Sequence, residues 1–374
     1  MNHAVIAGYV RSPFTPAGKG GLARTRPDDL AAAVVSELVR RTGVPPGDLE
    51  DLIVGCAFPE GEQGLNVART IGFLAGLPLG IGATTVNRYC GSSMQAIHAA
   101  AGAIACGAGV AFICCGVESM TRVPVMGFNP MPHPGLAERF PAAYVSMGCT
   151  AERLAARYGI ARSAQDAFAA ASQAKAAMAR AAGYFDNEII AVSGVTADGC
   201  LRPETTAAAL AALPPAFETT GTVTAGTSSP LTDGAAAVLV TAEDYARAHG
   251  LPILARLRAF AVAGCEPDLM GIGPVPATRK ALARAGLSLG EIGVIELNEA
   301  FAAQALACIG ELGLDPARVN SDGGAIALGH PLGATGARIT GKAALLLKRN
   351  GVQFALATQC IGGGQGIATI LEAV

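Results

Sequence analysis

The 374-residue sequence contains no tryptophan and few charged residues, 15% against 51% hydrophobic residues. Its 27 Lys and Arg nearly balance its 29 Asp and Glu, so no strong net charge is available to attract nucleic acid or an anionic membrane. Any anionic ligand must therefore be held by local contacts. The chain is longer than one hydrophobic core usually requires, which predicts two domains or two packed halves.

The sequence also lacks a convincing membrane span and an export signal. The uncharged stretch 99–117 is long enough to cross a bilayer, but its many Ala and Gly residues favour a helix, a turn and a buried strand. The opening residues MNHAVIAGYVRSPF lack the basic start and long apolar core of a signal peptide. We therefore expect a cytoplasmic protein.

The ten cysteines show no disulfide framework and no metal-binding pattern. They have no regular spacing, and no CxxC or HxxH pair indicates a zinc site or an iron cluster. The sequence predicts reduced thiols, most of them packing residues, with no metal and no tightly bound cofactor.

The order of elements repeats between the two ends of the chain. Residues 43–55 and 286–298 each begin with a Gly-started loop, continue through an acidic residue and end in an apolar strand. Val86-Asn87 and Val319-Asn320 each precede a Gly-rich turn and an Ala-rich helix, and these helices lead into the apolar strands VAFICCG and VQFALAT. The chain therefore reads as a duplication.

Strands that alternate with helices predict an α/β fold with a mostly parallel sheet covered on both faces, in two similar packed copies. Residues 119–231 break this rhythm with Pro-rich turns and with a helical run over 150–180. We interpret this stretch as a loop domain that covers a site, although a purely structural excursion is the alternative.

Cys90 is the best candidate nucleophile among the cysteines. It follows a strand that ends near Asn87 and precedes a helix that begins at about Gly91, so its sulfur lies at a helix N-terminus. Exposed N–H groups and the helix dipole favour the thiolate there. The alternative is a small buried packing residue.

His330 stands apart from the other four histidines as a candidate base. It lies in GGAIALGHPLGATGARI, at the position in the second half that Cys90 occupies in the first. Glycines allow close backbone approach, and the following proline fixes the turn. A histidine that merely fills a turn is the alternative.

Two further segments end at the same predicted sheet edge. Cys360 follows the second central strand in QCIGGGQG, whose glycines could cradle an oxyanion or simply form a turn. Asn298 ends another strand in IELNEAFAAQ and could be only a helix N-cap.

Taken together, these segments resemble the thiolase family over essentially the whole chain. VNRYCGS, NEAFA, GHPLGATGAR and CIGGGQG occur in the order typical of the family, a combination more specific than any one motif. VNRYCGSSMQAIH, RPETT, TAGTSS and GPVPA are most similar to degradative 3-ketoacyl-CoA thiolases, particularly those of bacterial fatty-acid oxidation complexes.

The resemblance implies the thiolase fold, with two duplicated βαβαβαββ halves in a layered α-β-α-β-α arrangement and an inserted loop domain. The N-terminal half is expected over 1–118, completed by about 231–250. The loop domain over 119–230 is expected to cover the coenzyme A site, and the C-terminal half spans 251–374.

The resemblance also implies roles for the site residues. Cys90 is the acylated nucleophile, His330 the base that activates it, and Cys360 the acid and base at the alpha carbon of acetyl-CoA. Asn298 is expected to hold a water beside His330, and the N–H groups of Cys90 and Gly362 form a second oxyanion hole. Coenzyme A, a substrate, is expected to contact the following residues: Arg202, Ser229, Ala225, Met147, Phe217 and Phe301.

Two departures from the family pattern concern coenzyme A and specificity. Related degradative enzymes carry extra residues between Gly199 and Arg202, where this chain has only Cys200 and Leu201, so altered nucleotide contacts are expected. Ser146 stands where biosynthetic enzymes often have histidine, which weakens the case for their specificity.

Three other functions remain open at this stage. The chain could condense two acetyl-CoA molecules, act as a silent acyl-CoA-binding scaffold, or be a ketosynthase-like condensing enzyme. Retention of Cys90, His330 and Cys360 argues against the scaffold, and the second cysteine, Cys360, argues against the ketosynthase.

A homodimer or homotetramer is expected, with a hydratase/dehydrogenase subunit as an optional partner and no nucleic acid.

Overall fold

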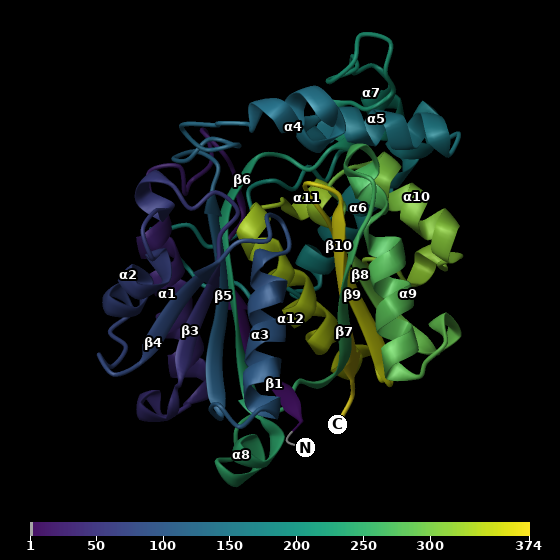
Figure 1. The fold of residues 1–374 in the computed structure, drawn as a ribbon. Coiled ribbons are helices and arrows are strands. Elements are labelled where there is room, and N and C mark those ends of the chain that lie inside the picture. The colour runs from purple at the N-terminus through teal and green to yellow at the C-terminus, as the bar shows by residue number, and fades with distance from the viewer. Residues whose placement is uncertain (1–2) are drawn as a thin grey trace.

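The computed structural model describes residues 3–374, in which ten strands form one hydrogen-bonded mixed sheet flanked by helices (Figure 1). The strand order is β4-β3-β5-β6-β1-β7-β10-β9-β8, with β2 paired beside β6. The strands are β1 (Ala4–Arg11), β2 (Thr15–Pro16), β3 (Asp51–Gly55), β4 (Gly82–Val86), β5 (Ala111–Ser119), β6 (Thr232–Ala242), β7 (Ala255–Gly264), β8 (Ile292–Leu297), β9 (Phe354–Ile361) and β10 (Gln365–Glu372).

The predicted duplication is confirmed by this strand order. The first half runs β4-β3-β5-β6-β1, and the second repeats it as β8-β9-β10-β7, with Val319 paired in parallel with Ile295 at the place that corresponds to β4. Only two residue pairs join β1 to β7, so the halves meet at a narrow seam. Gly43 and Gly286 end equivalent helices with φ values of 68° and 69°.

The prediction of a mostly parallel sheet is wrong. β3 is parallel to β4 and β5, and β8 is parallel to β9, but the remaining pairs are antiparallel. A parallel neighbour requires a crossover, usually a helix, whereas β10 follows β9 directly through the tight turn 362–364. The alternation of helices and strands in the sequence does not indicate this return strand.

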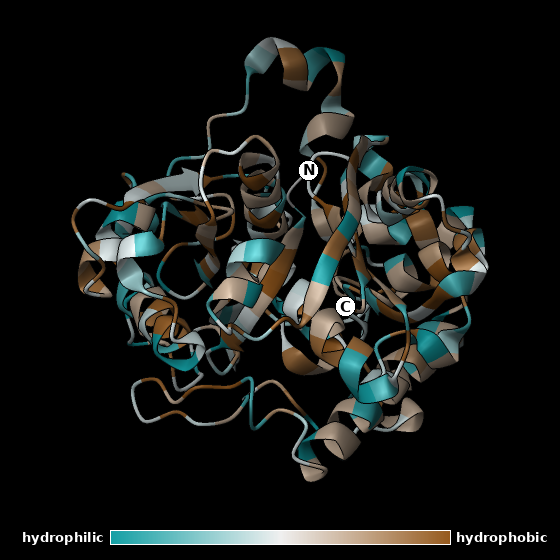
Figure 2. Cartoon of the chain, turned by 90° about the horizontal axis from the view of Figure 1, so that it is seen from below, coloured by the Kyte–Doolittle hydropathy of each residue, from teal (hydrophilic) through white to brown (hydrophobic). Residues whose placement is uncertain are grey.

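The helices form three layers around the two halves of the sheet. The outer layers carry bands of hydrophobic and hydrophilic residues, as expected of helices with one buried face (Figure 2). The outer helices of the first half are α1 (Pro27–Thr42) and α2 (Val67–Leu74), those of the second half are α9 (Pro274–Ala285) and α10 (Ala302–Leu312), and α3 (Ser92–Ala105) and α12 (Leu332–Asn350) lie between the halves.

The central core joins both halves around α3 and α12. Met94 and Ile97 of α3 and Ile339 and Leu346 of α12 are fully buried in one cluster with side chains of both sheet halves. Burial of each such side chain stabilises the fold by about 1.5–3 kcal/mol. This packing fixes the two helix N-termini relative to each other.

The segment between β5 and β6 lies above the ends of the strands (Figure 1). The predicted helical run over 150–180 is two helices, because Gly159 adopts a left-handed φ of 61° between them. The helices of this segment are α4 (Pro134–Arg139), α5 (Met147–Arg157), α6 (Arg162–Ala181) and α7 (Ala207–Ala211).

The remaining helical elements are short. They are α8 (Glu243–Ala248), α11 (Ala325–Leu328) and the 3-10 helices Pro46–Asp48, Gly61–Gln63, Pro141–Tyr144, Ala225–Thr227, Pro267–Ile272, Leu289–Glu291 and Pro316–Arg318. Within residues 3–374, no helix combines the length and apolar character needed to cross a membrane.

Candidate active site

Cys90 lies on a tight turn between β4 and α3. Tyr89 adopts φ 43°, which is uncommon for a residue other than glycine. The N–H of Tyr89 donates to Asn87 Oδ1 (2.8 Å), and the carbonyl of Tyr89 accepts from Ser92 Oγ (2.6 Å). These bonds fix the shape of the turn that carries Cys90, and Cys90 directly precedes Gly91, the N-cap of α3.

The ionisation of Cys90 differs from the sequence expectation. Burial raises the pKa of Cys90 to about 12, whereas hydrogen bonds from the N–H groups of Gly362 and of Cys90 itself lower it. The expected preference for the thiolate is wrong, because burial raises the pKa of Cys90 more than the two N–H hydrogen bonds lower it. The thiol is protonated at neutral pH, so attack requires a nearby proton acceptor.

His330 is buried and held by three contacts. Its N–H donates to Thr232 Oγ1 (3.0 Å), its Nδ1 lies 2.6 Å from Thr335 Oγ1, and its Nε2 lies 3.4 Å from Asn298 Nδ2. Burial lowers the pKa of His330 to about 3, and the positive charge of Arg338 lowers it further. The imidazole is therefore neutral at pH 7 and able to accept a proton.

The loops that precede α3 and α12 are tied together by polar contacts. Ala337 N–H donates to Ser93 Oγ (2.8 Å), which joins the second turn of α12 to the first turn of α3. The buried carboxylate of Glu118 accepts from Gly333 N–H (2.9 Å) in one half and Ala57 N–H (2.8 Å) in the other. The structure thus brings together the segments that carry the candidate nucleophile and the candidate base.

Cys360 lies within β9, one residue before its end, rather than after the strand as the sequence predicted, and it pairs with Gly366 of β10. Burial raises the pKa of Cys360 well above its usual value, and the neighbouring charge of Cys90 raises it further. Gln359 donates a side-chain hydrogen bond to the carbonyl of Cys90. The two cysteines are therefore placed at one site by adjacent segments.

Asn298 follows β8 and does not cap the next helix. Its N–H donates to Thr358 O (3.0 Å), and Phe301 is the residue that caps α10. Within residues 3–374 no group hydrogen bonds to the buried Asn298 Oδ1. Such an unpaired oxygen costs about 1–3 kcal/mol, so Asn298 can accept a further hydrogen bond beside His330.

Three of the residues predicted to contact coenzyme A, namely Met147, Phe217 and Phe301, form an apolar wall next to Cys360. Met147, Phe301 and Cys360 belong to one hydrophobic cluster. Phe217 packs edge-on against Phe301 with ring centroids 5.8 Å apart. A side chain added at Gly362 would begin 3.6 Å from Met147 Sδ.

The other residues predicted to contact coenzyme A are Ser229, Ala225 and Arg202. Ser229 N–H donates to Ala300 O (3.0 Å), and Ala225 is exposed at the start of a 3-10 helix. Arg202 is fixed through its backbone N–H, which donates to Gln173 Oε1 (2.8 Å), while its side chain is exposed. Within residues 3–374 the Arg202 guanidinium has no hydrogen bond or ion pair, so it is free to bind a ligand.

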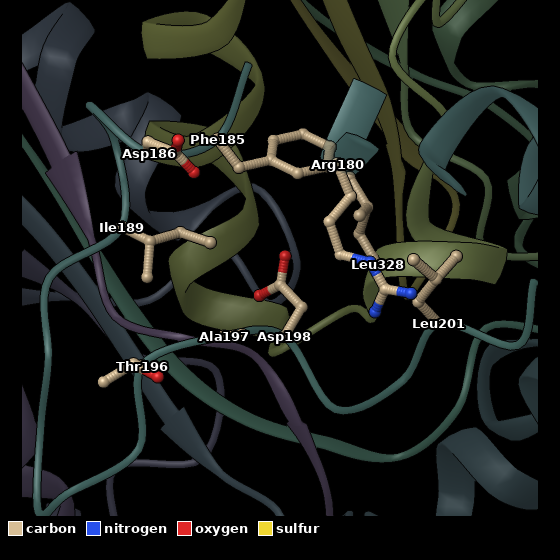
Figure 3. Close-up of a pocket in the computed structure, with 9 residues that line it drawn as sticks. All are labelled: Arg180, Phe185, Asp186, Ile189, Thr196, Ala197, Asp198, Leu201 and Leu328. Carbon is tan, nitrogen blue, oxygen red and sulfur yellow. The ribbon is translucent and has the colours of Figure 1, made fainter. Parts of the chain in front are cut away.

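Two cavities occur near these segments. One, of about 280 Å³, lies beside Tyr89. The other, of about 220 Å³, lies between the end of α6 and α11, and Asp198 points into it (Figure 3). Asp198 is already bound by the buried Arg11 (2.7 Å), so this second cavity borders a structural ion pair and contains none of the predicted site residues.

Several residues with direct contacts to the site were missed from the sequence. Thr335 lies within the GHPLGATG motif and Gln359 directly precedes Cys360, so motif proximity could have indicated both. Glu118 ends β5 with no motif signal, and only the fold shows that it joins the two halves.

Comparisons with known proteins agree with this geometry. Residues 4–244 match the profile "Thiolase, N-terminal domain", and residues 251–373 match "Thiolase, C-terminal domain". The 3-ketoacyl-CoA thiolases of Bacillus subtilis and Aliivibrio fischeri are each 50% identical to the chain, with 100% of both chains covered.

Two solved structures share the fold over the whole chain. Human mitochondrial 3-ketoacyl-CoA thiolase in complex with CoA has a TM-score of 0.93 and 36% identity, covering 100% of this chain and 98% of its own. Bacillus anthracis acetyl-CoA acetyltransferase has a TM-score of 0.92 and 39% identity, covering 100% and 99%.

Proposed function

The chain belongs to the thiolase family, and from that premise we propose that it cleaves 3-ketoacyl-CoA with CoA. The products are acetyl-CoA and an acyl-CoA shortened by two carbons, as in fatty-acid beta-oxidation. The observation that carries the proposal is that α3 and α12, whose starts carry Cys90 and His330, are hydrogen-bonded to each other, while Cys360 of β9 lies beside Cys90.

In the first step, the Cys90 sulfur attacks the keto carbon while its proton passes to His330. The bond between the alpha carbon and the keto carbon breaks, which leaves an acyl-Cys90 and the enolate of acetyl-CoA. Cys360 donates its proton to that alpha carbon, and its buried thiol suits a group that must begin protonated. We propose that His330 and a water that donates to the unpaired Oδ1 of Asn298 hydrogen bond to the enolate oxygen.

In the second step, the proton held by His330 returns to Cys360 after acetyl-CoA leaves. The incoming CoA thiol then gives its proton to His330, and its sulfur attacks the acyl group on Cys90. The N–H groups of Cys90 and Gly362 face the tetrahedral oxyanion, and loss of one such donor typically costs about 3–4 kcal/mol. Cys90 leaves as the thiolate and recovers its proton from His330.

For coenzyme A, we propose that Met147, Phe217 and Phe301 line the pantetheine path, with Ser229 and Ala225 beside it. The free guanidinium of Arg202 is placed to pair with a nucleotide phosphate. Coenzyme A acts as a substrate in this scheme, and no step requires a tightly bound cofactor.

The test is CoA-dependent loss of 3-ketoacyl-CoA absorbance with the purified chain, its Cys90→Ser variant and a Cys106→Ser control. Cys106 is exposed and outside the site, so that control should retain activity within twofold. Cys90→Ser should reduce kcat at least 10³-fold, because a serine hydroxyl is a far weaker nucleophile without an activated alkoxide. Equal activity of Cys90→Ser and the wild type would overturn the mechanism.

The biosynthetic condensation of two acetyl-CoA molecules is the second candidate function. The similarity to Bacillus anthracis acetyl-CoA acetyltransferase favours it, and the chemistry is the same reaction in reverse. Activity restricted to acetoacetyl-CoA would support this alternative, whereas activity on longer substrates supports the degradative function.

We propose that the chain forms a homo-oligomer through the exposed edge strand β4. Unpaired strand edges bind other strands readily, and exposed Leu65, Phe73 and Leu79 flank this edge. Light scattering after size exclusion should give a dimer or a multiple of it, and a monomer would contradict the proposal.

A hydratase/dehydrogenase partner and a cytoplasmic location stay predictions from the sequence.

The domain division also remains our proposal. It assigns 1–118 with about 231–250 to the first half, 251–374 to the second, and 119–230 to a loop domain over the coenzyme A site. The position of α5 beside the Cys360 cluster supports a covering role for that loop domain.

A further inference from the structure

The carboxylate of Glu118, at the end of β5, is buried beside the site and has no role in the two steps above. Glu118 is only 1% exposed. Within residues 3–374 it forms no ion pair with a Lys, Arg or His side chain. A buried charge without such a partner is costly, so other groups must stabilise it.

Four N–H donors stabilise the carboxylate of Glu118. One of its oxygens accepts from Ala57 N–H (2.8 Å) and Gly333 N–H (2.9 Å). The other accepts from Phe58 N–H (3.2 Å) and from the side-chain amide of Gln63 (2.9 Å). All four groups donate, so a protonated carboxyl group would find no acceptor for its own proton among them. The geometry therefore fits the ionised carboxylate.

The bond from Ala57 leads to the turn that carries the nucleophile. Asn87 Nδ2 donates to Ala57 O (3.0 Å), and Asn87 Oδ1 accepts from Tyr89 N–H (2.8 Å). Tyr89, with its left-handed φ of 43°, directly precedes Cys90. Glu118 thus fixes the segment on which the Cys90 turn rests.

The bond from Gly333 leads to the loop that carries the base. Gly333 is the second residue of α12, and His330 lies three residues before it, next to the N-cap Pro331. A side chain added at Gly333 would begin 2.9 Å from Glu118 Oε2 and 2.9 Å from Gly55 O. The base loop therefore packs directly against Glu118 and the end of β3.

We propose that Glu118 is a positioning residue for the cleavage reaction, whose negative carboxylate holds the Cys90 turn and the His330 loop together so that a proton can pass between them. The inference rests on the proposed function, and Glu118 acts through the backbone without touching the reacting atoms. Both steps use His330 as the proton carrier, so both depend on this spacing. A displacement of about 1 Å between reacting groups can lower a rate on the order of 10²-fold.

The charge of Glu118 also acts on the nucleophile. Burial is the main cause that raises the pKa of Cys90 to about 12, and the negative charge of Glu118 raises that pKa further. Cys56, whose thiol lies 3.7 Å from the carboxylate, also contacts Glu118, and burial raises the pKa of Cys56 as well. Removal of the Glu118 charge should therefore make the Cys90 thiol easier to ionise.

The experiment measures kcat and KM for CoA-dependent cleavage by the wild type, Glu118→Gln and Glu118→Asp. Glutamine keeps the shape but turns an NH2 group toward two of the N–H donors, and aspartate keeps the charge but is one methylene too short to reach both segments. Each variant should lower kcat at least tenfold and leave KM within threefold of the wild type.

Glu152→Gln is the matched control. Glu152 is also buried, and its carboxylate accepts from Thr222 N–H (2.8 Å) and Val223 N–H (2.9 Å) within the loop domain. This variant loses the same charge and similar bonds away from Cys90, so its kcat should stay within threefold of the wild type.

Alkylation of Cys90 by iodoacetamide, followed by mass spectrometry across a pH series, separates the charge from the bonds. The pH of half-maximal rate should decrease in Glu118→Gln and stay at the wild-type value in Glu118→Asp and Glu152→Gln. If Glu118→Gln does not fold, kcat of Glu118→Asp decides the matter.

The inference is overturned by wild-type kcat in a folded Glu118 variant, by an increase in KM alone, or by an equal loss of kcat in Glu152→Gln. An equal alkylation midpoint in Glu118→Gln and Glu118→Asp would also overturn it, because the carboxylate would then not be the charged group that it requires. Failure of the wild type to cleave any 3-ketoacyl-CoA would instead refute the proposed function.

Discussion

The hydroxyl of Thr335 should control the reactivity of His330. Thr335 Oγ1 lies 2.6 Å from His330 Nδ1 inside a buried site, which leaves Nε2 as the ring nitrogen that faces Asn298. Thr335→Val keeps the side-chain shape but leaves Nδ1 unpaired. An unpaired buried polar atom costs about 1–3 kcal/mol, and if that cost falls on the transition state, kcat decreases roughly 5-fold to 150-fold.

The assay is CoA-dependent cleavage of one 3-ketoacyl-CoA by the wild type, Thr335→Val and Thr335→Ser. Serine retains the hydroxyl, so Thr335→Ser should keep kcat within about threefold of the wild type. KM for CoA should change little in either variant, because Thr335 is not assigned to the coenzyme A path. A Thr335→Val enzyme with wild-type kcat, or one with only a raised KM, would refute the reasoning.

Two further predictions concern stability and coenzyme A binding. Burial lowers the pKa of His98 to about 3. As pH decreases below about 6.5, the unfolded state therefore binds a proton at His98 while the folded state does not. The free energy of unfolding should decrease by about 1.4 kcal/mol per pH unit until pH reaches about 3. His98→Gln should remove this contribution, which corresponds to about one bound proton, from the slope of the free energy of unfolding against pH over that window. Identical slopes for the wild type and His98→Gln, measured by urea titration at several pH values, would contradict this. A methyl group at Gly148 would collide with the Phe217 ring, so Gly148→Ala should raise KM for CoA by a factor on the order of ten. Gly102→Ala, which has open space around the added atom, is the matched control, and an equal KM in both variants would argue against Phe217 as part of the coenzyme A site.

The duplicated fold could be predicted because its signals are local. Each half repeats a Gly-started loop, a buried strand and a Gly-rich turn before an Ala-rich helix, and these patterns survive in the residues themselves. The direction of β6 and β10 could not be predicted in the same way. It depends on how long-range segments return to the sheet, which neither propensity nor periodicity records.

The positions of the candidate site residues could be predicted, but their ionisation could not. Motif spacing placed Cys90 and His330 at equivalent helix starts, and the structure pairs those helices. The pKa of Cys90 depends instead on burial, which raises it, and on a hydrogen bond from Gly362 N–H in the second half of the chain, which lowers it. From the sequence, Asn298 could be either a helix N-cap or a site residue. Only the structure shows that Phe301, three residues later, is the N-cap of α10.

The most direct test of the account is to trap the acyl-enzyme. The chain is mixed with a 3-ketoacyl-CoA in the absence of CoA, quenched with acid, digested and analysed by mass spectrometry. We predict an acyl group two carbons shorter than the substrate on the peptide that contains Cys90, together with one equivalent of released acetyl-CoA. An adduct on Cys360 or on another cysteine, or acetyl-CoA release with no adduct, would contradict the account.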